Sequence, residues 1–244
     1  MGIVFYFRFP EHLLLFMVKT FFDFLPFAVG IAISPVPIIT VILSLFSARA
    51  RWNGPAFLLG WILGIAVVCI PVMVLTDISS VPDNSPPSKI ASIVRLVVGA
   101  ILLLSAIQKW RTRPRKGEAG SIPKWLLMID KVSPIKVLGV GFFFADLTNP
   151  KNTALTIAGA FVIAHSGLPM AINIGMVIIF LMISSLGIAV PVIYYIVGGM
   201  AARKMLDRWK SWLVANNSAV MSILFLVFGI ILISNGLKSV QNWI

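Results

Sequence analysis

The sequence predicts an all-α integral membrane protein whose six transmembrane helices form two inverted three-helix repeats, with helices 1 and 4 broken. Three observations predict this fold. Of the 244 residues, 59% are hydrophobic and only 11% are charged, whereas soluble domains carry about 25% charged residues. Six apolar runs are long enough to cross a bilayer, which takes roughly 20 residues. The runs also fall into two sets of three with matching breaks.

The six runs and the segments between them suggest two halves and a linker. The runs occupy residues 21–46, 55–76, 90–108, 137–164, 168–202 and 215–237. Residues 109–136 form a longer basic connection that contains three prolines and two glycines, a composition typical of a flexible joint. We therefore expect an N-terminal repeat at 1–110 that starts with an interfacial segment, a basic cytoplasmic linker at 111–135 and a C-terminal repeat at 136–244.

The basic residues predict the orientation in the membrane. The connections after the first, third and fifth runs carry two, eight and four Lys or Arg residues, against four on the other side. The positive-inside rule places the side rich in Lys and Arg in the cytoplasm. We therefore expect a multi-pass protein of the cytoplasmic (inner) membrane, with both termini outside and with loops 1–2, 3–4 and 5–6 in the cytoplasm.

Several other classes of protein are not supported. The net charge of +12 would suggest nucleic acid in a soluble protein, but here the basic residues lie between apolar runs, so no nucleic-acid partner is expected. Cys69 is the single cysteine and forms neither a disulfide nor a CxxC metal site. No HExxH, GxSxG or phosphate-loop motif occurs. We expect no enzyme, no cofactor and no metal.

The side-chain pattern of residues 203–213 predicts an amphipathic helix that lies in the cytoplasmic headgroup layer. In a helix over these residues, one face is apolar and the remainder is basic. The apolar face contains Met205, Leu206, Trp209, Trp212 and Leu213. Membrane lipids are therefore expected partners, and two roles stay open: a plain anchor that tolerates anionic lipid, or a regulatory lipid sensor.

Each half has a polar, proline-containing break near the middle of its first run. The first break is Ser34, Pro35, Val36 and Pro37, and the second is Asn149, Pro150, Lys151 and Asn152. Weaker matches occur in the same order in the second and third runs of each half: Pro71 with Pro191, Gly64 with Gly187, and Gly99 with Gly229. Because each half has an odd number of runs, the second half would insert upside down, as in many secondary transporters.

The prolines locate a candidate transport site. Proline lacks an N–H and clashes with the carbonyl four residues earlier, so Pro35 should free the carbonyl of Ile31 and Pro150 that of Asp146. A freed carbonyl at membrane depth must meet protein, water or a ligand. Two such breaks at the bilayer midplane predict a substrate site between them. The competing interpretation is that these prolines only kink helices for packing.

Lys151 is the charge that needs an explanation. A lysine at the centre of a membrane helix costs about 2.5–3.5 kcal/mol, so it should face the protein interior or water. Asp146 is the nearest acid, and only the break at Pro150 would allow the two to meet. We expect Lys151 to attract an anionic substrate group or to cycle a proton, with Asp146 as counter-charge or proton-coupling carboxylate. A purely structural ion pair is the alternative.

Gly60 and Gly64 form a small-xxx-small pattern that brings helices close together. The pattern fits packing within one chain as well as it fits a homodimer, and both interpretations stay open.

These motifs also resemble a known family. A Pro-x-Pro break, a short basic loop into a glycine-rich helix, and a later Asn-Pro-Lys resemble the LysE superfamily of exporters. The strings at 30–38 and 47–61 look more specifically like its GAP branch, which includes glycopeptidolipid- and sulfolipid-addressing proteins. The resemblance covers roughly residues 22–240. It implies a six-helix inner-membrane exporter of a small molecule or an envelope lipid precursor, although Val36 replaces the glycine of amino-acid exporters and puts that substrate in doubt.

A non-transporting scaffold for envelope-lipid export is the alternative function. It would share the fold and the membrane location, but it would tolerate changes of Asn149, Lys151 and Asn152.

Overall fold

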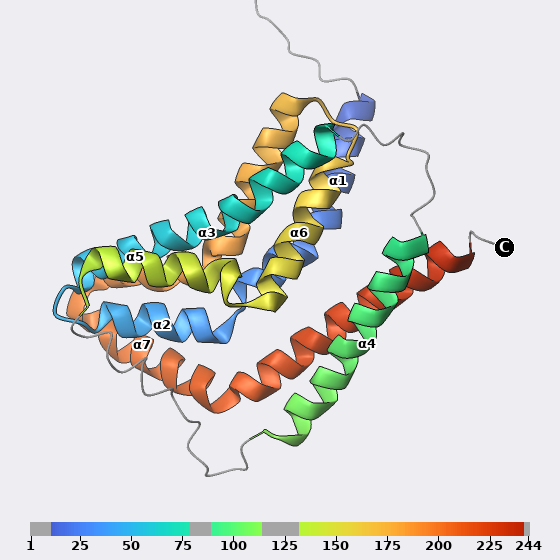
Figure 1. The fold of residues 1–244 in the computed structure, drawn as a ribbon. Helices are drawn as coiled ribbons and strands as arrows, with labels where there is room; N and C mark the ends of the chain where they lie inside the picture. Colours follow the sequence, from blue (N-terminus) through green and yellow to red (C-terminus); the bar gives the residue numbers. More distant parts are fainter. Residues whose placement is uncertain (1–10, 79–88, 114–131, 242–244) are drawn as a thin grey trace, which may run out of the picture.

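The computed structural model describes residues 11–78, 89–113 and 132–241, and all regular structure in these ranges is helical (Figure 1). The interfacial segment expected before residue 11 and most of the expected linker at 111–135 lie outside the described residues. In chain order the helices are α1 (Glu11–Ala32), α2 (Pro35–Leu45), α3 (Ala50–Ile78), α4 (Lys89–Arg111), α5 (Pro134–Phe142), the π-helix η2 (Phe143–Leu147), α6 (Pro150–Ala164) and α7 (Met170–Gln241).

The described helices are those of a multi-pass membrane protein. Four segments are long and apolar enough to cross a bilayer: Leu13–Ala32, Ala50–Leu75, Met170–Gly199 and Ala201–Lys238. Their outward faces carry large apolar side chains, such as Leu15 at 68% exposure and Val197 at 83%. Water would not wet such faces, whereas lipid does. The all-helical membrane class is therefore confirmed, while four candidate spans are identified among the described residues, against the six expected.

Two of the expected runs are divided in the structure. The first becomes α1 and α2, and the fourth becomes α5, η2 and α6. Both breaks fall where the sequence placed them, because Pro35 and Pro150 each begin a new helix, the position at which a missing N–H costs nothing. α2 has 11 residues and α6 has 15, which at 1.5 Å per residue is too short to cross a core of about 30 Å.

The chain reverses direction inside α7. Its one non-helical residue is Gly199, with φ 52° and ψ −130°, a conformation that glycine adopts without steric penalty. The expected run at 168–202 therefore ends at Gly199 instead. After this turn the C-terminal half of α7 runs alongside α4 (Figure 1).

The expectation of a separate interfacial helix at 203–213 is only partly right. The segment is the start of the C-terminal half of α7 and is continuous with the last span. Its apolar face is divided: Leu206 is fully buried in the protein, whereas Met205 and Trp212 are 40% and 58% exposed. The part of the face that contains Leu206 therefore packs against the other helices and does not insert into the headgroup layer.

Glycines set the closest helix contacts. A Cβ added to Gly60 would collide with the carbonyl of Leu138 in α5, and one added to Gly64 would collide with that of Phe142. The small-xxx-small pattern of α3 is therefore used within the chain. A Cβ on Gly187 would likewise collide with the carbonyl of Ala32 at the end of α1. Because these glycines have no side chain, α3 and α7 can pack closely against the two broken helices.

Candidate functional site

The two polar breaks meet in the interior, although they are far apart in the sequence. The Ser34 hydroxyl donates to Oδ1 of Asn152 at 2.9 Å, across 118 residues of chain. Nζ of Lys151 donates to the same hydroxyl at 2.8 Å and to the carbonyl of Gly30 at 2.7 Å. These three bonds join the end of α1 and the start of α2 to the first turn of α6. α1 and α6 lie side by side (Figure 1).

The first break affects two carbonyls, where the sequence suggested one. The residue before a proline avoids the α-helical region, and Ser34 is extended, with φ −74° and ψ 110°. Its N–H bonds to the carbonyl of Ile31 at 3.2 Å. Pro35 thus deprives Ile31 of its α-helical partner, as expected, and Ser34 replaces that partner. The carbonyl of Gly30 loses this N–H and accepts from Lys151.

The second break is built around a single π-helical turn. The N–H of Thr148 bonds five residues back to Phe143 at 3.0 Å, which defines the turn. The carbonyl of Asp146 accepts from the N–H of Asn149 at 3.0 Å and from the hydroxyl of Thr153 at 2.6 Å. Pro150 therefore does deprive Asp146 of an α-helical partner, but neighbouring groups of the same chain replace it. π-turns are frequent at functional sites.

Asn152 is the central side chain of the site. It accepts from Ser34, and its Nδ2 donates to the carbonyl of Ala145 at 2.8 Å. Its own N–H bonds to Oδ1 of Asn149, which caps the start of α6, at 3.4 Å. The side chain of Asn152 thus connects the second break to the first, and within the second break it connects η2 to α6.

Lys151 and Asp146 do not form an ion pair in the structure. Lys151 reaches across to α1, whereas Oδ1 of Asp146 accepts from the hydroxyl of Thr156 in the second turn of α6 at 3.0 Å. Within the described part of the chain, Oδ2 of Asp146 has no hydrogen-bond partner. The expected counter-charge contact is therefore absent, because the break turns the two side chains toward different helices.

Burial separates the predicted site residues into two groups. Ser34, Asp146, Lys151 and Asn152 are at most 8% exposed. The other four predicted residues bound the breaks: Pro35 and Pro37 are buried in α2, Asn149 is half-buried, and Pro150 is exposed. Since Ser34 and Lys151 touch directly, no cavity separates them. Among the described residues, no group of three or more His, Cys, Asp or Glu side chains could hold a metal ion.

Sequence reasoning missed three partners of the four buried side chains of this site. Two of them, Gly30 and Ala145, contribute main-chain carbonyls, which no side-chain pattern reveals. The third, Thr156, is a hydroxyl in an otherwise apolar run, six residues after the proline. A polar residue on the inner face of a membrane helix was the available signal for Thr156.

The arrangement favours an anion. Helices α2 and α6 both begin at the contact, and a helix N-terminus carries partial positive charge. Lys151, when protonated, adds a positive charge at the same place, next to neutral oxygen atoms. A family model described as Sap, sulfolipid-1-addressing protein, matches residues 24–238. The chain belongs to this family.

The family match includes both breaks and extends from α1 to the C-terminal half of α7. This family assignment agrees with the resemblance of the sequence motifs to sulfolipid-addressing proteins. No curated protein and no solved structure gives a significant match to the chain.

Proposed function

We propose that this protein is an exporter of the secondary-transporter kind, which moves a small molecule or an envelope lipid precursor across the cytoplasmic membrane. The substrate site lies between the Ser34 and Lys151 breaks. The observation that supports this proposal most is the environment of the Lys151 side chain. It is 8% exposed, its partners are a carbonyl and a hydroxyl, and no described carboxylate forms an ion pair with it.

A structural role alone does not explain such a lysine. Removing an ammonium from water costs several kcal/mol, and two hydrogen bonds to neutral oxygen atoms offset this cost without the opposite charge that usually accompanies a buried ion. Ionisable residues inside membrane segments otherwise mark substrate or ion pathways. An incoming anionic group would supply the missing charge by replacing Gly30 or Ser34 as the partner of Lys151. The family description names a sulfolipid, and we infer that the anionic end of such a lipid is the kind of group that binds here.

The helix contacts support an arrangement as two inverted halves. Gly64 packs against the carbonyl of Phe142, just before the second break, and Gly187 packs against that of Ala32, just before the first. Each half thus uses a glycine of its second run to hold the broken helix of the other half. The third runs also meet reciprocally, since a Cβ on either Gly99 or Gly229 would lie 3.1 Å from the carbonyl oxygen of the other.

Such a pair of halves provides a route to alternating access. One half would rock against the other about the breaks while the site stays near the midplane. The direct contact between Ser34 and Lys151 then corresponds to a closed site, which opens when a substrate group separates the two side chains. The excess of Lys and Arg residues in loops 1–2, 3–4 and 5–6 supports a cytoplasmic location for these loops.

Asp146 is the group that we assign to proton coupling. It is fully buried, and one of its oxygen atoms is unused by the described residues. A carboxylate in this position can take up one proton and release it on the other side, with no change in covalent bonds. Because Asp146 and Lys151 belong to the same break, proton uptake and substrate release would act on one element.

The test uses a strain that lacks the protein. Unbiased lipid and metabolite profiling of this strain identifies the compounds whose export fails, and variants are then tested for rescue. Lys151→Met should fail to rescue, since it keeps the length of the side chain and removes the charge. Lys136→Met is the matched control, because Lys136 is exposed on α5 and outside the breaks; it should rescue fully. Rescue by a correctly inserted Lys151→Met protein would refute the proposed site.

A membrane scaffold for envelope-lipid export is the second candidate. It is favoured by the direct Ser34–Lys151 contact, which leaves no cavity between the breaks. A scaffold acts through its outer surface, so Lys151→Met and Asn152→Ala would both rescue the strain. An exporter requires that both variants fail.

A further inference from the structure

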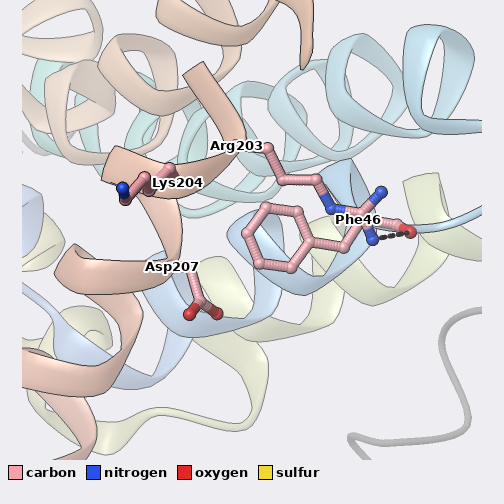
Figure 2. Close-up of a pocket in the computed structure, with 4 residues that line it drawn as sticks. All are labelled: Phe46, Arg203, Lys204 and Asp207. Carbon is pink, nitrogen blue, oxygen red and sulfur yellow. Dashed lines mark hydrogen bonds between the residues drawn. The ribbon is translucent and has the colours of Figure 1, made fainter. Parts of the chain in front are cut away.

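A second polar feature lies away from the breaks, where α2 ends and the C-terminal half of α7 begins. A pocket of about 440 Å³ is lined by Phe46, Arg203, Lys204 and Asp207 (Figure 2). Its volume falls within the range of about 300–1,000 Å³ that is usual for sites of small ligands. None of these residues takes part in the contact between the two breaks.

The bonds of the pocket residues leave positive charge available in the pocket. The guanidinium of Arg203 lies over the ring of Phe46, at 5.0 Å from its centre, and donates one bond to the Phe46 carbonyl at 3.5 Å. A guanidinium has five N–H donors, so most of those of Arg203 stay available. Asp207 is already paired with Lys210 at 2.6 Å. The acid of the pocket is therefore neutralised within its own helix.

Lys204 supplies a second available cation. It is exposed, and it forms no ion pair or hydrogen bond with another residue of the described ranges. In Figure 2 the guanidinium of Arg203 and the side chain of Lys204 lie on opposite sides of the Phe46 ring. Both residues also follow the turn at Gly199, near the start of a helical segment, where the helix dipole favours an anion.

The surroundings place this pocket at a membrane surface. Trp52 and Trp212 are 70% and 58% exposed, and tryptophan is enriched at the level of the lipid headgroups. The short connection that follows Phe46 adds two exposed arginines, Arg49 and Arg51. Cations together with exposed tryptophan are the chemistry that anionic membrane lipids attract.

We propose that this pocket binds the phosphate or sulfate headgroup of one anionic lipid of the membrane surface on which the basic connections lie. Arg203 contacts the anion, Lys204 attracts it from the other side of the Phe46 ring, and the Phe46 ring contacts the carbon atoms next to the anion. The lipid then bridges α2 and the C-terminal half of α7. The site is independent of the contact between the breaks, and a non-transporting scaffold would have it equally.

Native mass spectrometry of the full-length protein in detergent tests the site. The protein is titrated with phosphatidylglycerol, with phosphatidylcholine and with inorganic phosphate, and the dissociation constant of the first adduct is measured. We expect one phosphatidylglycerol to bind more tightly than the phosphatidylcholine or phosphate. Lys204→Ala should weaken the first phosphatidylglycerol about 5-fold and Lys204→Glu about 25-fold, as expected for one and two unit changes of charge near a lipid headgroup.

The matched control is Lys238→Ala, because Lys238 is another exposed lysine of α7, roughly 50 Å along the helix from Lys204. This variant should bind phosphatidylglycerol like the unchanged protein. Equal losses for Lys204→Ala and Lys238→Ala would show general charge attraction and overturn the site. Inorganic phosphate that binds as tightly as phosphatidylglycerol would overturn the assignment to a lipid. Lys204 is exposed and forms no hydrogen bond or ion pair with the described residues, so both variants of Lys204 should fold normally.

Discussion

Replacing Lys151 with methionine should separate function from stability. Methionine removes the cost of the buried ammonium, which is about 2.5–3.5 kcal/mol at the centre of a membrane helix. It also removes two hydrogen bonds, to Gly30 and to Ser34, worth about 1.5–3 kcal/mol each for a charged donor. The lost hydrogen bonds outweigh the relieved cost at the midpoints of these ranges, so we expect the free energy of unfolding to fall by about 1.5 kcal/mol, within a range from about −0.5 to 3.5 kcal/mol.

The alternative of a structural ion pair predicts a different magnitude. Breaking a buried pair leaves one charge uncompensated and costs about 3–5 kcal/mol. For a chain of this size, 1 kcal/mol corresponds to about 2–4 °C in Tm. The Tm of the purified protein in detergent should therefore fall by about 3–6 °C for Lys151→Met, while export is lost. A loss of about 15 °C or more would exceed what the two hydrogen bonds allow and would indicate a buried ion pair.

The remaining predictions concern the contacts around the breaks. A double-mutant cycle between Ser34→Ala and Asn152→Ala should give a coupling of about 0.6–1.7 kcal/mol in detergent unfolding, and a value near zero would contradict their hydrogen bond. Gly64→Ala should lower Tm because its Cβ meets a carbonyl, whereas Gly175→Ala, which meets nothing within 4 Å, should raise it slightly; equal shifts would contradict the close contact. Asp146→Asn cannot carry a proton, so export in vesicles should no longer respond to a pH gradient; an unchanged response would exclude this carboxylate from coupling.

The breaks show how far sequence reasoning reaches. Pro35 and Pro150 start helices where the sequence placed them, because a missing N–H acts locally and needs no tertiary contact. Ile31 loses its helical partner to Pro35 as expected, but the N–H of Ser34 bonds to its carbonyl, and Lys151 bonds to the carbonyl of Gly30, which the sequence did not indicate. The difference arises because the extended conformation imposed on Ser34 directs its N–H to Ile31 instead of Gly30.

The partners of Lys151 depend on longer-range packing. The expected contact with Asp146 relied on proximity in the sequence, but the lysine bonds to residues 117 and 121 positions away. Bare glycine surfaces on α3 and α7 decide which helices approach closely enough for such bonds. Distances along the chain carry no information about that approach.

The sequence by itself determined that this protein lies in a lipid bilayer and where its helices are broken. An apolar composition selects the bilayer, and prolines interrupt a helix through their own covalent structure. The tertiary structure alone decided that the two breaks touch, that Lys151 lacks a carboxylate partner among the described residues, and that a basic pocket forms beside Phe46. The reason is that side chains distant in sequence meet only when helix packing fixes their separation, and packing is a property of all the helices together.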